Sequence, residues 1–513
     1  MPGGSFLIPS PYGQFKSSWA TLKDPSQNDG DGRIAASQAR APIVPGDVPL
    51  HRALGPVHLT MIGIGTTIGA GIFVIAGTVS AQHAGPAVLL SFLVAATGCF
   101  FAALCYAELA AMIPQAGSAY TYAYATMGRA MAWFIGWNMV LEFGVSASTV
   151  AAGWSGYFLN LLHSFGIDYP AAWANAPIAG TGISDMHLTG AIVNLPAGLM
   201  MLAITAILVV GIGESARFNA AMVILKVAII AVVILFGLPY LQPANFEPFI
   251  PPNTGSWGHY GWSGILAASG TLFFAYIGFE AVSVAAQEAR NPERDLPISI
   301  LAAFAICTIL YVLMAAVLIG IVDFHLLDVA DPVSFALERH PNLKWLVFPV
   351  NIAAIAGLVS VAFGCLYGQS RVFYGMARDG FLPPAFSKVH PRFRTPHLCT
   401  LAIGVAGALI AAIFPLDLLA DLVSIGTLLA FISVCAGILI LRKRSPHAPR
   451  RFRTPWVWAV APAGIVTCGV MMLSLSNGTW LRLAVWTALG FLIYFMYGIR
   501  HAAPSKWSVS GES

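Results

Sequence analysis

The sequence predicts an all-α, polytopic membrane protein. Hydrophobic residues make up 58% of the 513 residues and charged residues only 9%, far below the roughly 25% charged residues of a soluble domain. The apolar residues form runs of about 20 or more, the length that an α-helix needs to cross a bilayer. The charged residues lie in short clusters between these runs. This composition excludes a soluble enzyme.

We count twelve spanning segments, joined by loops too short to form a soluble domain. The expected spans are 57–80, 86–112, 130–160, 189–212, 218–240, 261–286, 297–321, 345–376, 398–415, 419–441, 456–476 and 480–499. Because so little of the chain lies outside them, function has to reside within the helix bundle.

The two ends of the chain differ from the spans in composition. Residues 1–50 are rich in Ser, Gly, Pro, Asp and Gln and do not open with the apolar stretch of a cleavable signal peptide. We expect them to form a disordered cytoplasmic tail, and residues 501–513 to form a second, short cytoplasmic tail.

The basic residues predict the orientation of the spans. With both termini in the cytoplasm, 22 of the 26 Lys and Arg residues fall on the inner side, where such residues accumulate. Arg339, Lys344 and Arg482 fall outside, and Lys226 lies within a span. The net charge of +4 is explained by this bias, so we expect no nucleic-acid partner.

The seven cysteines give no sign of a disulfide framework or a metal site. All lie in or at the edge of apolar segments, and none forms a CxxC pair. They are interpreted as small buried residues. We expect no metal, no cofactor and no catalytic residue.

Glycines predict that the first and sixth spans are interrupted. Span one holds four glycines in the nine residues from Gly63 to Gly71, and span six holds Gly270 and Gly278 near its middle. Irregular backbone at membrane depth persists where it lines a cavity. The alternative is an unbroken helix that packs closely on a neighbour through its small residues.

The spacing of these breaks suggests two inverted five-span repeats with a binding site near the midplane. The half-helix after the first break would offer N–H groups and a positive dipole end to a carboxylate. The second break would offer carbonyl oxygens to an ammonium. A ligand that carries both groups on one carbon is an α-amino acid.

Motifs over residues ~55–395 resemble those of the amino acid–polyamine–organocation (APC) superfamily, and in span three those of its cationic amino acid transporter branch. The motifs are Gly65–Phe73, Cys105–Tyr120, Gly136–Glu142, Gly153–Tyr157, Phe274–Glu280, Glu288–Pro292 and Arg371–Gly380. The resemblance implies a LeuT-type 5+5 inverted repeat with broken helices 1 and 6. It implies a ten-helix transport core at 51–441 and two additional transmembrane helices at 442–500.

The resemblance also implies which residues bind substrate. The carboxylate of an amino acid is expected to bind the backbone of Thr67, Ala70 and Gly71. Its amino group is expected to bind the backbone carbonyls of Phe274, Ala275 and Ile277. Phe273 or Phe274 is expected to form part of a gate, with simple packing in the core as the alternative.

Charged residues inside the spans are costly and are often functional. Lys226 lies about 13 Å into span five by helical rise, and its family position implies that its protonation drives the transport cycle. Snorkelling to the inner surface is the alternative.

Glu142 is expected to face the substrate side chain or to bond neighbouring hydroxyls. Glu108 and Glu280 are expected to hold an inner gate closed, and Cys365 to limit the size of the substrate side chain.

These observations together favour a secondary active amino acid transporter that works by proton symport and alternating access. An amino acid exchanger and a non-transporting amino acid sensor are the alternatives. A channel would need rings of charge, and an ATP-driven pump a phosphate-binding loop; neither is present in the sequence.

We expect a bacterial inner membrane or another plasma membrane as the location. The sequence does not indicate the substrate side chain, the oligomeric state or an auxiliary membrane subunit.

Overall fold

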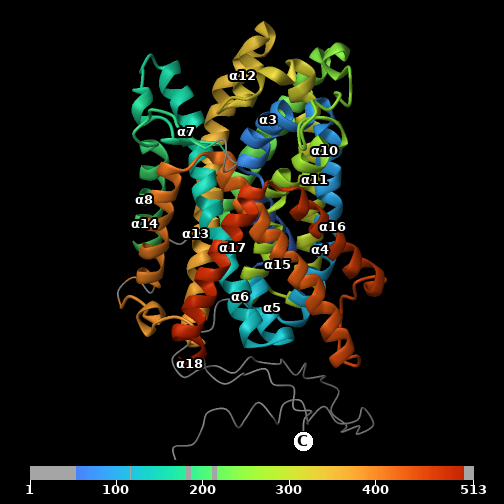
Figure 1. Cartoon of the computed structure of the whole chain (residues 1–513), viewed down its shortest axis with the longest axis vertical. Coiled ribbons are helices and arrows are strands. Elements are labelled where there is room, and N and C mark those ends of the chain that lie inside the picture. Colours follow the sequence, from blue (N-terminus) through green and yellow to red (C-terminus); the bar gives the residue numbers. More distant parts are fainter. Residues whose placement is uncertain are drawn as a thin grey trace, which may run out of the picture. The chain divides into compact units, whose positions relative to one another are not determined.

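The computed structural model describes residues 54–501, apart from 116, 181–185, 211–215, 392 and 394. This part of the chain is predominantly helical, as predicted (Figure 1). The N-terminal tail expected at 1–50 and the C-terminal tail after residue 501 lie outside the described residues.

The first part of the chain forms the following elements: α2 (Pro56–Thr67), η1 (Gly71–Ile75), α3 (Ala76–Val79), η2 (Ser80–Ala84), η3 (Gly85–Ala87), α4 (Val88–Met112), α5 (Ser118–Met127), α6 (Arg129–Met139), η4 (Val140–Val145), α7 (Ser146–Ser164), η5 (Ala171–Trp173), α8 (Leu195–Val210) and α9 (Ala216–Gly237). The loop between α7 and α8 carries a two-stranded antiparallel hairpin. Its strands are β1 (Ile178–Ala179) and β2 (His187–Leu188), paired with Ile178 opposite Leu188.

The second part forms these elements: η6 (Leu238–Tyr240), η7 (Pro243–Phe246), α10 (Gly261–Leu272), η8 (Phe273–Tyr276), η9 (Phe279–Glu288), α11 (Pro292–Ile321), η10 (Phe324–Leu326), α12 (Pro332–Arg339), η11 (Pro341–Leu346), α13 (Val347–Arg378), η12 (Pro384–Ser387), α14 (His397–Ile413), α15 (Leu416–Arg444), α16 (Val457–Ser474), α17 (Asn477–Ile493), η13 (Tyr494–Gly498) and α18 (Ile499–His501). The short helix α12 and the short helix α5 lie at opposite ends of the bundle (Figure 1).

Each of the twelve predicted ranges overlaps a helix, or a series of consecutive helices, in the structure. Among the described residues, eight helical stretches are long and apolar enough to span a membrane. Two shorter apolar helices, α8 and α14, have 16 and 17 residues. A polytopic membrane protein is therefore confirmed, while the count of twelve spans and the inverted repeat stay predictions.

The predicted interruption of span one is present. Helix α2 ends at Thr67, and Ile68 adopts an extended conformation with φ −73° and ψ 102°. The chain becomes helical again at Gly71, in the wider turn of η1. An unbroken helix with close small-residue packing was the alternative for this span, and it is wrong.

Span six is interrupted in the same way. Helix α10 tightens into η8, Ile277 is extended with ψ 132°, and Gly278 has a φ of +126°. Two features of the structure exclude a side chain at position 278. The positive φ disfavours a Cβ, and a Cβ would lie 2.6 Å from the carbonyl carbon of Thr66. Gly278 therefore lets the two breaks cross closely.

The segments α2 and η9 of the two interrupted spans are joined to each other. Leu54, just before α2, forms a parallel bridge with Ala289, just after η9. Its N–H donates to Glu288 O at 3.0 Å, and its carbonyl accepts from Arg290 N at 2.9 Å. At the break, Thr66 Oγ1 donates to Gly278 O at 2.8 Å. Bonds at both ends tie α2 and η9 into one unit.

Helix α17 is attached to α6 by tryptophans. Trp133 Nε1 donates to Gly490 O, and Trp137 Nε1 donates to Trp486 O, each at 2.9 Å. The rings of Trp137 and Trp486 stack with their centroids 4.5 Å apart. Because α6 begins span three, the expected additional segment 442–500 is anchored to the expected core.

The loop before α12 holds a carboxyl group whose ionisation opposes folding. Burial, with a further contribution from Glu338, raises the pKa of Asp331 from 3.8 to about 7. Its Oδ2 is buried and has no hydrogen-bond partner among the described residues. A group whose pKa is raised on folding lowers stability as pH rises from its unfolded pKa to its folded pKa. The stability that protonated Asp331 contributes is therefore lost as the pH rises from about 4 to about 7.

We expect Asp331→Asn to remove this pH dependence. The wild-type protein in detergent should lose more thermal stability between pH 5 and pH 8 than the variant loses. Melting temperatures of both proteins at the two pH values measure the difference. Equal losses in both proteins would show that Asp331 does not contribute.

Candidate functional site

Lys226, on α9, reaches the break in span one. Its Nζ donates to the carbonyl oxygens of Gly65 at 2.5 Å and Ile68 at 2.9 Å. The side chain is fully buried, so the ammonium does not extend to the membrane surface. The last carbonyls of a helix have no intrahelical donor and form the negative end of its dipole. Lys226 therefore caps the broken end of α2 with a positive charge.

Helix α13 makes room for this lysine and supplies a third partner. Lys226 Nζ lies 3.4 Å from Ser360 Oγ. One turn earlier, a Cβ on Gly357 would lie only 3.3 Å from Lys226 Cδ. A charged lysine at membrane depth costs on the order of 2.5–3.5 kcal/mol when it has no partners. The two carbonyls and the hydroxyl offset that cost.

Tyr311, on α11, links the two breaks. Its hydroxyl lies 2.8 Å from Thr67 O in span one and 2.8 Å from Ala275 O in span six. A phenol has a single proton to donate, so it bonds one of these carbonyls at a time. Tyr311 was not predicted as a site residue. A hydroxyl-bearing side chain within the apolar run 297–321 was the available signal, but the sequence does not say which carbonyls it meets.

The residues expected to bind the substrate carboxylate all lie at the first break. Thr67, Ala70 and Gly71 are buried. The Thr67 hydroxyl donates to Gly63 O at 2.7 Å. The Thr67 carbonyl accepts from the Tyr311 hydroxyl. A Cβ on Gly71 would overlap Ala275. The two breaks are thus in direct contact, and an amino acid between them would require them to separate.

The residues expected to bind the substrate amino group lie at the second break. Phe274, Ala275 and Ile277 are buried. The Phe274 carbonyl accepts from Ile277 N at 3.2 Å, and the Ala275 carbonyl is engaged by Tyr311. Every one of these six backbone positions is therefore brought to a single place in the bundle.

Glu142 and Glu280 lie beside this place and face each other. Glu142 belongs to η4, a wide helical turn in span three, and Glu280 follows the break in span six. Both are fully buried, and the two carboxyl groups are close enough to interact electrostatically. Both Glu280 oxygens accept from Gly278 N at 2.9 Å. Among the described residues, neither Glu142 oxygen has a hydrogen-bond donor.

Two further predicted residues are packed into the same region. Cys365 is buried on α13, with its Sγ 3.8 Å from Ser146 Oγ. Phe273 is fully buried, and its ring lies 5.2 Å from that of Phe431 on α15. Phe273 thus bridges spans six and ten in the present, closed arrangement.

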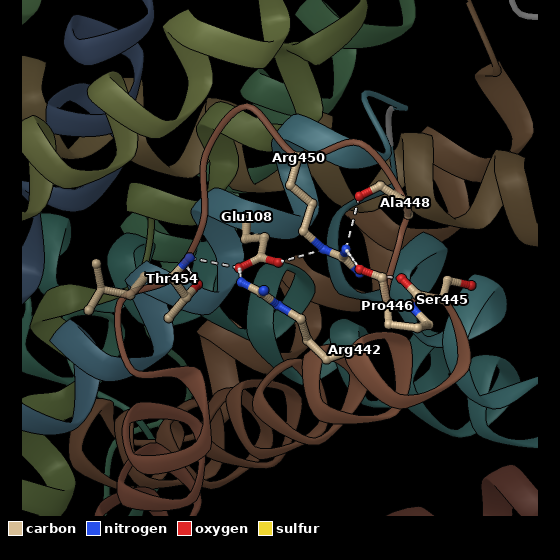
Figure 2. A network of polar contacts seen from close by, with 8 residues as sticks. Glu108, Arg442, Ser445, Pro446, Ala448, Arg450 and Thr454 are labelled. Carbon is tan, nitrogen blue, oxygen red and sulfur yellow. Dashed lines mark hydrogen bonds and ion pairs between the residues drawn. The ribbon is translucent and has the colours of Figure 1, made fainter. Parts of the chain in front are cut away.

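Glu108, on α4, binds a different part of the chain (Figure 2). Its Oε2 accepts from Arg442 Nη2 at 2.8 Å and from Thr454 N at 2.7 Å. Its Oε1 lies 3.1 Å from Arg450 Nε. Among the described residues, these partners belong to the end of α15 and the loop before α16. Glu108 therefore fixes that loop to α4.

With this geometry in hand, the chain can be placed among known proteins. Paired helix breaks that meet deep in a polytopic bundle define the class of membrane transporters. Residues 54–499 match the family model described as "Amino acid permease". The chain belongs to this amino acid permease family, within the APC superfamily.

Curated relatives cover nearly the same length. The chain is 42% identical to the Methylthioribose transporter of Bacillus subtilis over 457 residues, which cover 89% of this chain and 95% of the relative. It is 42% identical to the Branched-chain amino acid permease BcaP of the same organism over 458 residues, with the same coverage. It is 38% identical over 408 residues to the vacuolar Cationic amino acid transporter 4 of Arabidopsis thaliana, covering 77% of this chain and 64% of the relative. The family consists of transporters and not of enzymes.

We expect Glu108→Gln to destabilise the protein strongly. Two arginines would lose the charge of their shared buried acceptor, and breaking a buried ion pair costs about 3–5 kcal/mol. The matched control is Glu293→Gln, because Glu293 pairs with Arg451 at 2.6 Å while both side chains are largely exposed. Such a pair contributes about 0–1 kcal/mol. Melting temperatures in detergent compare the two; equal shifts would contradict the assignment.

We expect Tyr311→Phe to lower kcat/KM for amino acid uptake about tenfold or more. The substitution leaves two buried carbonyls without their shared donor, at a cost of about 1–3 kcal/mol. Tyr260→Phe is the control, because Tyr260 OH donates to a backbone carbonyl outside both breaks, that of Ala81, at 2.6 Å. Uptake kinetics in proteoliposomes should separate the two variants. Equal losses would mean that linking the breaks has no special importance.

Proposed function

We propose that this chain is a secondary active amino acid transporter that carries its substrate together with a proton. The single observation that carries the proposal is the buried Lys226 ammonium at the broken end of α2. It is a titratable cation in direct contact with the backbone expected to bind substrate. We further propose the LeuT-type fold with a transport core at 51–441 and two additional helices at 442–500.

The proposed substrate position lies between Gly71 and Ala275. The carboxylate binds at the N–H groups where the helix resumes after the first break, near Thr67, Ala70 and Gly71. The ammonium binds at the carbonyl oxygens of the second break. These belong to Phe274, Ala275 and Ile277. The present contact of Gly71 with Ala275 supports a closed form of this site, and substrate entry separates the two segments.

The proposed proton step acts on the cap of α2. Protonated Lys226 holds the carbonyls of Gly65 and Ile68. Loss of the proton removes the charge and one of its three N–H donors, which weakens the cap. Because Tyr311 bonds Thr67 and Ala275, a shift at the end of α2 reaches span six. Proton release and movement of the two breaks are coupled in this way.

The substrate side chain is proposed to point toward Glu142 and Cys365. The Gly-rich site suits a neutral side chain and the Glu142 carboxyl group would tolerate a cationic one, so a broad or neutral amino acid is the proposed substrate. Phe273 is proposed as an outer element of the gate. Glu280, which accepts from Gly278 N, is proposed to hold the inner gate closed. Glu108 contributes by fixing the loop before α16.

The protein is proposed to lie in a plasma membrane, the inner membrane in bacteria, with both termini in the cytoplasm. The bacterial relatives and the distribution of basic residues support this location. Exchange of amino acids is the second candidate mechanism, and amino acid sensing without transport is the third. Both would use the same binding site.

The test is uptake of a radiolabelled amino acid panel into proteoliposomes, with and without an inward proton gradient. We expect gradient-stimulated uptake of one or a few amino acids by the wild type. Lys226→Ala should abolish the stimulation, while the exposed Lys388→Ala should retain it.

Two results would contradict the proposal in different ways. Uptake that ignores the gradient and survives Lys226→Ala would favour exchange or facilitated diffusion. Absence of uptake by folded protein under both conditions, together with thermal stabilisation by an amino acid, would favour a sensor.

A further inference from the structure

The loop between α15 and α16 concentrates the positive charge of the chain. Six basic residues lie between 442 and 453, three in the last turn of α15 and three in the loop that follows it. Two acidic side chains pair with them, Glu108 and Glu293. Six basic side chains against these two carboxylates leave a local charge of six minus two, or +4.

Two of the six basic residues, Arg442 and Arg450, form contacts that hold the loop in place and are not part of its exposed surface. Arg450 is buried, and its guanidinium donates to the carbonyls of Ser445 at 2.7 Å, Pro446 at 3.0 Å and Ala448 at 2.9 Å (Figure 2). Together with the contact of its Nε with Glu108, these bonds define the path of the loop. Arg442 pairs with the same carboxylate. The loop is therefore held in one conformation.

The other four basic residues are exposed. They are Lys443, Arg444, Arg451 and Arg453. Arg451 pairs with Glu293, whereas Arg444 donates to the neutral Thr126 carbonyl at 3.2 Å and forms no ion pair with another described residue. The structure thus presents a cationic surface between two helices that are long and apolar enough to span a membrane, at the end of α15 and the start of α16.

Two exposed tryptophans adjoin these cations. Trp456 and Trp458 are 87% and 58% exposed, and Lys443 Nζ lies 5.9 Å from the centre of the Trp458 ring. Trp456 has a left-handed backbone, with φ 42° and ψ 49°, which is rare for a bulky residue and marks functional positions. Tryptophans of this kind concentrate at the headgroup level of membranes.

We propose that Lys443, Arg444, Arg453, Trp456 and Trp458 form a docking surface for the headgroup of an acidic phospholipid. Guanidinium groups bind phosphate oxygens through paired hydrogen bonds. Each basic residue near an anionic membrane surface contributes attraction that salt weakens. A zwitterionic headgroup brings its own ammonium and does not offset the excess charge. The indole rings seat the lipid at the interface.

The surface is connected to the bundle. Glu108 ties the loop to α4, and Arg451 ties it to Glu293 at the start of α11. A bound lipid therefore fixes a loop that joins α4, α11, α15 and α16 on one side of the membrane. The binding claim goes beyond the proposed transport function and does not depend on it.

The test is native mass spectrometry of the full-length protein with equal amounts of phosphatidylglycerol and phosphatidylcholine of the same chain length. We expect phosphatidylglycerol adducts to dominate on the wild type. Lys443→Gln/Arg453→Gln should weaken that binding about 25-fold, because each basic residue contributes roughly a fivefold factor. Trp456→Leu/Trp458→Leu should weaken it as well while keeping the charge.

The matched control is Lys388→Gln/Arg500→Gln, which removes the same charge at other exposed positions. It should bind phosphatidylglycerol as the wild type does. Equal binding of the two lipids by the wild type, or equal loss in the control variant, would overturn the proposal. Displacement of the lipid by inorganic phosphate alone, without a requirement for acyl chains, would also overturn it in favour of a free-anion site.

Discussion

The cap that Lys226 places on the broken end of α2 is the interaction on which the rest of the site depends. A helix that stops within a membrane exposes carbonyl groups that lipid cannot satisfy. In this protein a single ammonium bonds two of them, Gly65 and Ile68, and Tyr311 bonds a third, that of Thr67. The break in span one is therefore stable only because two neighbouring helices supply donors to it. Each donor in turn connects the break to another part of the bundle.

The geometry around the break joins local structure to function. Gly278 and Gly71 let the two broken spans approach until backbone meets backbone, and the bridge at Leu54 joins α2 to η9. A ligand that enters between the breaks must move this joined unit relative to α9, α11 and α13, which hold Lys226, Tyr311 and Ser360. Binding, proton transfer and opening of the site are then different aspects of one rearrangement.

Much of this arrangement could be predicted from the sequence, because the deciding signals are local. Runs of apolar residues predicted the ends of the helices to within about six residues, and the glycines of Gly63–Gly71 predicted the first break. The depth of Lys226 in its span predicted a functional role, which stays a prediction. Tyr311 and the partners of Glu108 could not be predicted, because they are tertiary contacts. Tyr311 lies 244 residues from Thr67, and Arg442 lies 334 residues from Glu108. Nothing in the local sequence of Glu108 distinguishes a gate from an anchor for a distant loop.

The central claim is that the two helix breaks together form the amino acid site. The most direct measurement is an experimental structure of the protein with a transported amino acid bound. The account predicts that the ligand lies between Gly71 and Ala275, with its carboxylate at the N–H groups after the first break and its ammonium at carbonyls of the second. Lys226 should remain at the end of α2. An amino acid bound elsewhere, with Gly71 still in contact with Ala275, would contradict it.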